Sequence, residues 1–146
     1  MNIFIMSRLE IENMIKTGVA TDACVIGFRD VKDDRNINYG ELFKSIFTVV
    51  VDDLEYDELE ETGLTYEKYF SEAKELAQFI HKVVLDDTDI ICQCEYGQGR
   101  SAACAAAVLE VLYGTGISVF SDYRYYPNKI IYNKLVVELT KILKKV

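Results

Sequence analysis

Apolar positions in the chain follow two patterns, short continuous runs and longer stretches with helical spacing. Four runs rich in apolar and β-branched residues have the length of buried strands: 2–6, 23–28, 45–51 and 89–93. Elsewhere apolar residues recur every three or four positions, which predicts helices over 8–18, 66–84 and 101–113 and a last helix from about Ile130. Strands and helices therefore alternate along the chain.

Capping residues mark several of the expected helix ends. Ser7 stands before the first helix with Glu10 three residues later, which is the spacing of a capping box. Thr65 is placed to cap the long helix over 66–84, and Gly114 is placed to end the helix that starts near Ser101. These signals support the helices that the apolar spacing predicts.

The order of the elements predicts a single α/β domain over residues 1–146. We expect a central, mostly parallel sheet of four to five strands flanked by helices. Residues 29–40 are polar and turn-rich, and residues 52–63 are strongly acidic, so both segments are expected to be loops. The chain has no internal repeat and only one proline, and no stretch has the composition of an interdomain linker.

Composition excludes several classes of function. The formal net charge of -8 disfavours nucleic acid and anionic membranes as partners. No apolar run is long enough for a bilayer, and the first residues lack the features of a signal peptide, so we expect a cytoplasmic protein with reduced thiols. The four cysteines (Cys24, Cys92, Cys94 and Cys104) lack the paired spacing of a zinc site, and we predict neither a metal nor a cofactor.

The eight residues CEYGQGRS, at positions 94–101, lie between an expected strand and an expected helix. Gly97 and Gly99 let the backbone turn tightly and approach a ligand, and the free N–H groups of the helix start point back into the turn. The backbone amides from Glu95 to Arg100 can then converge on one phosphate, which the Arg100 guanidinium also binds. The residues expected to bind phosphate are Glu95, Tyr96, Gly97, Gln98, Gly99 and Arg100.

A cysteine in the same turn acquires a chemical role. The donors that bind an anion also stabilise a thiolate, which is the nucleophilic form of Cys94. The hydroxyl of Ser101 can donate a hydrogen bond to this sulfur and help it leave later. The alternative interpretation is an ordinary strand-to-helix turn with a buried cysteine and a solvated arginine.

This segment resembles the phosphate-binding loop of the cysteine-dependent protein tyrosine phosphatases, with the pattern [HX]-C-x-x-G-x-x-R-[ST]. Cys94, Gly97, Arg100 and Ser101 match that C-x5-R loop. The chain is similar to the compact dual-specificity branch and its small bacterial members in the order of its segments, over roughly residues 45–135. These segments are FTVVVDD, YFSEAKELAQFIHKV, IICQC and YYPNKIIYNKL. The resemblance implies a phosphatase-like fold and metal-free hydrolysis of phosphate monoesters. One departure is Gln93, where the family usually has histidine.

The resemblance also implies a general acid in the acidic segment. The family takes an aspartate from the loop after the strand that precedes the long helix, which here is the place of Asp52 and Asp53. Spacing favours Asp53, with Asp52 close behind and Asp57 a distant third. The acid protonates the leaving oxygen and can afterwards accept a proton from the attacking water.

The leading hypothesis is a hydrolase of phosphorylated protein or peptide side chains, first phosphotyrosine and also phosphoserine or phosphothreonine. Its mechanism would pass through a phosphocysteine at Cys94. Two alternatives stay open: a catalytically weak phosphate-binding module of the same fold, suggested by Gln93, and sulfur or arsenate chemistry with Cys92 or Cys104 as a second thiol. The oligomeric state and the physiological substrate are not encoded in these patterns.

Overall fold

All four predicted strands form one sheet in the computed structural model, which describes residues 1–143. The strands are β1 (Ile3–Met6), β2 (Cys24–Arg29), β3 (Ser45–Val50) and β4 (Ile90–Gln93). They lie in the order β1-β4-β2-β3, and each neighbouring pair is parallel. The prediction of one α/β domain with a parallel sheet of four to five strands is confirmed.

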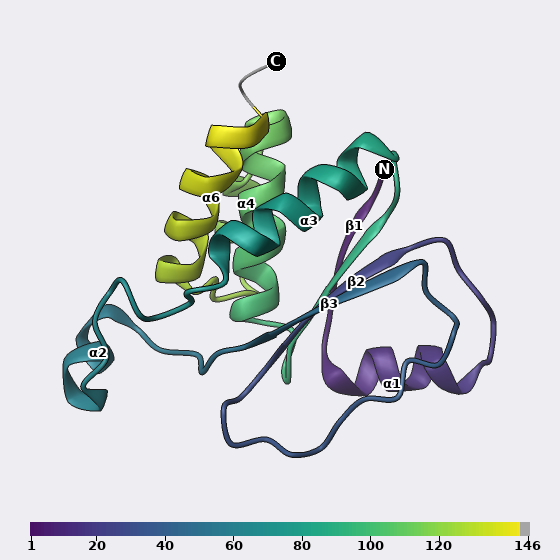
Figure 1. The fold of residues 1–146 in the computed structure, drawn as a ribbon, viewed down its shortest axis with the longest axis horizontal. Helices are drawn as coiled ribbons and strands as arrows, with labels where there is room; N and C mark the ends of the chain where they lie inside the picture. The colour runs from purple at the N-terminus through teal and green to yellow at the C-terminus, as the bar shows by residue number, and fades with distance from the viewer. Residues whose placement is uncertain (144–146) are drawn as a thin grey trace.

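Helices cover both faces of this sheet (Figure 1). The helices are α1 (Arg8–Lys16), α2 (Tyr56–Thr62), α3 (Ala73–Leu85), α4 (Arg100–Tyr113), α5 (Ile117–Phe120) and α6 (Lys129–Leu143). The larger core lies between the sheet and α3, α4 and α6, whereas α1 covers the other face over a smaller core. Residues of β2 alternate between these cores: Ile26 and Phe28 belong to the larger one, and Val25 belongs to the smaller one.

The parallel pairing brings the ends of three strands together. Gln93 is in register with Met6 on one side and with Gly27 on the other. The segments that leave β1, β2 and β4 therefore start at the same edge of the sheet. A ligand site at the carboxyl edge of parallel strands is common in open α/β sheets.

The long helix begins at Ala73, so the prediction of a helix over 66–84 capped by Thr65 is wrong at its start. Residues 66–72 form turns, and Thr65 caps only the first of them, accepting a hydrogen bond from the N–H of Lys68 at 3.3 Å. Phe70 has a φ of 54°, which no helix tolerates. Burial offsets this strained backbone, because the Phe70 ring packs 6.3 Å from that of Phe28 in the larger core.

Two further helices were not predicted. The acidic segment 52–63 contains α2, which begins after Glu55, whose N–H donates to the Glu58 carboxylate at 3.0 Å. The short helix α5 follows Gly114. Other predicted ends are confirmed: Ser7 and Glu10 form the capping box of α1, and Gly114 ends α4 in the left-handed conformation.

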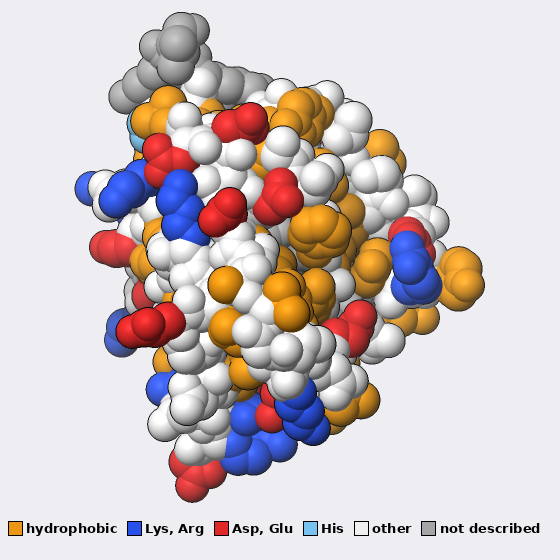
Figure 2. Space-filling model, turned by 90° about the vertical axis from the view of Figure 1, so that its right-hand side faces the viewer, with side chains coloured by type: hydrophobic (Ala, Val, Ile, Leu, Met, Phe, Trp, Pro, Cys, Tyr) orange, Lys and Arg blue, Asp and Glu red, His pale blue; other side chains and the backbone are white. Residues whose placement is uncertain are grey.

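The surface mixes charges of both signs. On the face shown in Figure 2, acidic and basic side chains are interspersed with exposed hydrophobic atoms, and several basic groups gather beside acidic ones at its lower end. That end is at the height of α1 in Figure 1. Within residues 1–143, no helix has the length and hydrophobicity needed to cross a membrane.

Candidate active site

The loop between β4 and α4 is anchored to three other parts of the chain. Its first residue, Cys94, donates its backbone N–H to the Met6 carbonyl at 3.2 Å. Three N–H groups from elsewhere bind loop carbonyls: Arg8 to Glu95 at 3.1 Å, Tyr126 to Gln98 at 2.8 Å, and Asn128 to Gly99 at 3.1 Å. The start of α1 and the segment before α6 thus fix the loop from two sides.

These anchors orient the loop amides. In a trans peptide the N–H points away from the C=O of the same unit. Because the carbonyls of Glu95, Gln98 and Gly99 bind outward, the N–H groups that follow them point the opposite way. Across residues 1–143, none of the N–H groups of residues 95–99 donates a hydrogen bond to protein. The loop therefore presents free donors, as a site for an oxyanion requires.

Gly97 fits the loop for two reasons. Its φ is 66°, a conformation that residues with a side chain rarely adopt. A Cβ at this position would also lie 2.7 Å from the backbone nitrogen of Ser7. Close packing of the loop on the start of α1 therefore needs glycine here.

The side chain of Cys94 faces that of Ser101, which lies in the first turn of α4. The Sγ of Cys94 lies 3.0 Å from the Oγ of Ser101, within hydrogen-bond distance. Both residues are buried, and Cys94 lines a cavity of about 200 Å³ that also contains Gly99 and Arg100 in its wall. The predicted nucleophile, its hydrogen-bond partner and the predicted anion-binding arginine are thus close together.

The guanidinium of Arg100 is held on one side only. Its Nη1 donates to Oδ1 of Asp30 at 2.6 Å and to the Val51 carbonyl at 2.8 Å. Its Nε is buried and has no partner in the described part of the chain. A buried donor is costly when unpaired, and Arg100 lines the cavity of Cys94. Nε–H and one Nη–H of a guanidinium can donate two parallel hydrogen bonds to two oxygens of one phosphate.

Asp53 lies directly over Gly99. A Cβ built on Gly99 would be 2.2 Å from Oδ2 of Asp53, so this carboxylate occupies the space that a side chain would need. The other oxygen, Oδ1, accepts a hydrogen bond from Nδ2 of Asn128 at 2.8 Å. Asp53 also lines the cavity that holds Cys94. The carboxylate is therefore positioned beside the cysteine loop.

Asp52, in contrast, binds backbone and tyrosine groups outside this cavity. Its Oδ1 accepts a hydrogen bond from the Val31 N–H at 2.9 Å, and its carbonyl accepts one from the Tyr69 hydroxyl. It does not line the cavity of Cys94, and neither does Asp57. Burial raises the pKa of Tyr69 to about 12, so this hydroxyl stays protonated and keeps its hydrogen bond to the acidic segment.

Gln93 binds the backbone, not the sulfur. Its Nε2 donates to the Cys94 carbonyl at 3.0 Å, and its Oε1 accepts from the Tyr39 hydroxyl at 3.4 Å. Burial raises the pKa of Tyr39, which keeps that hydroxyl a donor. The amide thus supports the start of the loop without bringing a charge to it.

Sequence reasoning missed several residues of the site. Asp30 holds Arg100, and Asn128 holds Asp53, yet neither was predicted to contribute. Tyr126 lines the cavity as well. Asn128 follows the only proline and precedes a helix, a position typical of a helix cap, and this signal could have drawn attention to it. Within residues 1–143, no group of three acidic, histidine or cysteine side chains is placed to hold a metal ion.

Comparison with solved structures identifies the fold. DUSP15 matches with a TM-score of 0.62 at 12% identity, over 99% of this chain and 92% of that chain. Human DUSP28 matches with a TM-score of 0.57 at 17% identity, over 99% and 95% of the two chains. The human tyrosine phosphatase-like serine/threonine/tyrosine-interacting protein matches with 0.57 at 15%, over 94% and 87%.

The chain has a dual-specificity-phosphatase-like fold. Similarity at this level of identity concerns the fold alone. No protein-family model matches the sequence, and no curated protein matches it either. The functional assignment therefore depends on the geometry around Cys94.

Proposed function

We propose that this protein is a cysteine-dependent phosphatase that hydrolyses phosphate monoesters on protein side chains. One observation carries the proposal: Cys94, Arg100, the loop residues Tyr96, Gln98 and Gly99, and Asp53 all line one cavity. Thiolate, anion donors and acid are the three components that hydrolysis through a phosphocysteine requires. The similarity in fold to dual-specificity phosphatases supports the same conclusion.

The reaction takes two steps. The Cys94 thiolate attacks phosphorus, an Sγ–P bond forms, and the bond from phosphorus to the ester oxygen breaks while Asp53 gives that oxygen a proton. Water then attacks the phosphocysteine, and the Asp53 carboxylate accepts its proton as the S–P bond breaks. Ser101, 3.0 Å from the sulfur, donates a hydrogen bond to the leaving thiolate. Arg100 and the loop amides stabilise the charge on the phosphoryl oxygens in both steps.

The decisive experiment uses Cys94→Ser. The wild-type protein should release phosphate from an aryl phosphate, whereas Cys94→Ser should have no detectable turnover and still bind inorganic phosphate or vanadate. Cys92→Ser is the matched control, because Cys92 lies in β4 two residues away and outside the cavity. Full turnover by Cys94→Ser would rule the mechanism out.

The same assay separates the proposal from a phosphate-binding module without turnover. That alternative rests on Gln93, which supplies hydrogen bonds to the loop but no charge. A binding module would retain a phosphopeptide and release no phosphate. Since Gln93 contacts the backbone and not Sγ, we expect Gln93→His to change the rate without creating or abolishing turnover.

Sulfur or arsenate chemistry would need a second thiol near Cys94, and Cys92 and Cys104 are the candidates. The hydrogen bond with Cys92 and burial raise the pKa of Cys104, so this thiol stays protonated and is a poor nucleophile. Both residues are fully buried. Thiosulfate and arsenate assays test this alternative directly, and turnover of either would favour it.

Charge around the cavity favours a protein substrate. Glu55 and Glu58 line it together with Asp53, and Arg100 is the one basic residue in its described lining. Acidic side chains repel a substrate that carries several phosphates. Phosphotyrosine is the first substrate to test, followed by phosphoserine and phosphothreonine. A relation to the small bacterial members of the dual-specificity branch remains a prediction.

A further inference from the structure

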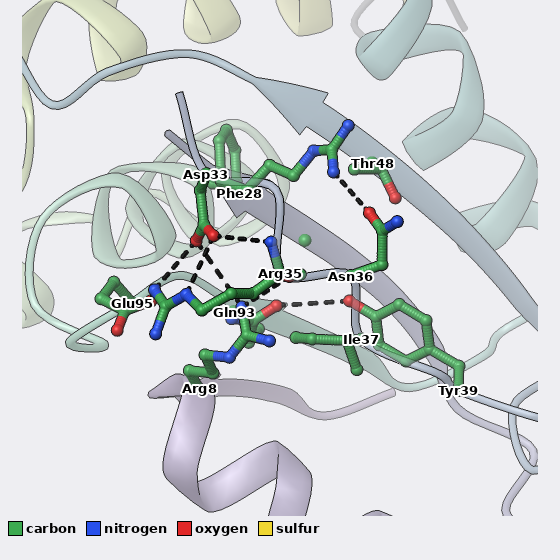
Figure 3. Close-up of a pocket in the computed structure, with 12 residues that line it drawn as sticks. Arg8, Phe28, Asp33, Arg35, Asn36, Ile37, Tyr39, Thr48, Gln93 and Glu95 are labelled. Carbon is green, nitrogen blue, oxygen red and sulfur yellow. Dashed lines mark hydrogen bonds and ion pairs between the residues drawn. The ribbon is translucent and has the colours of Figure 1, made fainter. Parts of the chain in front are cut away.

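A second cavity lies on the face of the sheet that α1 covers (Figure 3). It has a volume of about 240 Å³, and we call it the arginine pocket because Arg8, Arg29 and Arg35 line it. These three residues come from the start of α1, the end of β2 and the following loop. The arginine pocket shares no lining residue with the cavity of Cys94.

Two of the three arginines have carboxylate partners. The Asp33 carboxylate accepts from Nε and Nη2 of Arg35 at 2.9 and 3.0 Å and lies 3.6 Å from Nη1 of Arg8. Arg35 also pairs with Glu95 at 3.2 Å. Hydrogen bonds from Arg35 lower the pKa of Asp33 to about 2, so this carboxylate is ionised at neutral pH. Figure 3 shows the ion pair at one side of the pocket.

Arg29 differs from its neighbours. Its Nη1 donates to the neutral Oδ1 of Asn36 at 2.6 Å, and its Nε is buried without a hydrogen-bond partner in residues 1–143. The ion pairs of the described residues include none with Arg29. A partly buried guanidinium with no carboxylate partner favours an acceptor with negative charge. The lining thus has three arginines against two carboxylates in a chain whose net charge is -8.

Neutral donors surround the same space. The hydroxyls of Tyr39 and Thr48 and the amide of Gln93 lie in the pocket wall. Tyr39 is directed at Gln93, to which it donates at 3.4 Å, and Gln93 Nε2 also donates to the Cys94 carbonyl, whereas the Thr48 hydroxyl has no partner among the described residues (Figure 3). Gly27 forms part of the floor, and a Cβ there would lie 2.8 Å from the Tyr39 hydroxyl. The volume is below the range of about 300–1,000 Å³ that holds drug-sized ligands. A phosphate or a short carboxylate fits this size and this set of donors.

We propose that the arginine pocket binds a small oxyanion, a phosphate or a carboxylate, whose oxygens accept hydrogen bonds from the guanidinium of Arg29 and from the neighbouring donors. The site is separate from the proposed catalytic one and does not depend on turnover. Gln93 and Glu95, the residues on either side of Cys94, form part of its wall. An anion bound there therefore lies against the back of the cysteine loop.

The test is a titration of the ¹⁵N-labelled chain of 146 residues followed by NMR. The probes are inorganic phosphate and malonate, each against sodium chloride of equal ionic strength. Saturable shifts of the Gly27 and Tyr39 amides report the arginine pocket, and those of Gly97 and Gly99 report the cysteine loop. We expect Arg29→Gln to weaken binding at the first pair by about tenfold or more and to leave the second pair unchanged.

Two further variants complete the test. Arg100→Met should remove the phosphate response of Gly97 and Gly99 and keep that of the arginine pocket, and Arg124→Gln, at an exposed ion pair with Asp122, should change neither. Saturable shifts at Gly27 and Tyr39 with only one of the two probes would identify the kind of anion that the arginine pocket binds. If Arg29→Gln fails to fold, the titrations of the wild-type protein and of Arg100→Met still show whether the arginine pocket binds an anion. Absence of saturable shifts at Gly27 and Tyr39 with both probes overturns the proposal.

Discussion

A single glycine determines where the proposed acid lies. At Gly99 the missing side chain leaves the space that the Asp53 carboxylate fills, and the three atoms nearest to an added Cβ all belong to Asp53. The φ of Gly99 is -110°, which alanine also adopts. The requirement for glycine is thus the position of a neighbouring carboxylate and not the backbone conformation.

Gly99→Ala should therefore lower the activity and leave the stability nearly unchanged. The added methyl group displaces the end of a flexible side chain, so we expect the free energy of unfolding to change by less than about 1 kcal/mol. Turnover should fall by about 10²-fold or more, as in Asp53→Asn, because the acid is moved from the leaving group. Steady-state kinetics and urea unfolding measure the two effects.

A double-mutant cycle tests the cause of that loss. If Gly99→Ala acts through Asp53 alone, adding it to Asp53→Asn costs no further activity. Multiplied losses in the double variant would mean that the methyl group disturbs the loop itself. Asp52→Asn is the matched control, since Asp52 binds the backbone of Val31 and lies outside the cavity, so its kcat should stay close to that of the wild-type protein.

The sequence could predict residues whose role follows from their own type and spacing. The positions of Cys94, Arg100 and Ser101 around one turn followed from the motif and from the helix start. The choice between Asp52 and Asp53 could not be made from spacing alone, because adjacent residues of an extended segment point to opposite sides. The partners Asp30 and Asn128 were missed because 70 and 75 residues separate them from the groups that they hold.

At the scale of elements, Asn128 joins the start of α6 to the acidic segment. Its Oδ1 accepts the Ile131 N–H at 2.9 Å, which caps the helix, and its Nδ2 donates to Asp53. The same Nδ2 lies 3.0 Å from the Tyr69 hydroxyl. One amide therefore has both a helix-capping role and a positioning role.

Two substitutions at Asn128 should separate these roles. Asn128→Ala removes the cap and the donor, and we expect a loss of stability of about 1–2 kcal/mol together with a lower kcat. Asn128→Ser keeps an oxygen that can cap the helix, so it should recover much of the stability but not the kcat. Phosphate affinity should stay unchanged in both. Recovery of kcat in Asn128→Ser would contradict a positioning role for the amide donor.

The elements that the sequence predicted are those with strong local signals. The four strands and α1, α4 and α6 have continuous apolar runs or helical spacing with a cap. The helix over 66–84 was predicted too long because Tyr69, which lies in a turn, is buried and has helical spacing to Ala73 and Leu76. The helix α2 was missed because acidic side chains at 52–63 lack an apolar stripe, and only its capping residues mark it.

At the scale of the whole molecule, the parallel sheet explains why distant segments meet at one site. The ends of β1, β2 and β4 lie at one edge, so the segments that follow them bring Ser7, Asp30 and Cys94 together. The alternation of elements predicted such a sheet but not the order of its strands. That order is set by long-range packing, which no local signal encodes.

The same long-range packing gives the molecule a specific response to alkaline pH. The buried Tyr69 hydroxyl binds the Asp52 carbonyl, the Leu54 N–H and Asn128, and so connects the acidic segment, the turn before α3 and the start of α6. Burial raises its pKa from 10.0 to about 12. The stabilisation is complete below pH 10 and is lost as the pH rises through 12, because the unfolded chain ionises first. A shift of this size corresponds to about 2–3 kcal/mol.

Tyr69→Phe should therefore change how stability depends on pH. At pH 7 we expect it to lower the free energy of unfolding by about 1–3 kcal/mol, since the Asp52 carbonyl and the Leu54 N–H lose their partner. Between pH 10 and 12 the wild-type protein should lose stability more steeply, so the difference between the two proteins should shrink. Urea unfolding at pH 8 and 11 measures this, with the exposed Tyr123→Phe as control. A difference that stays constant with pH would mean that Tyr69 ionises equally in both states.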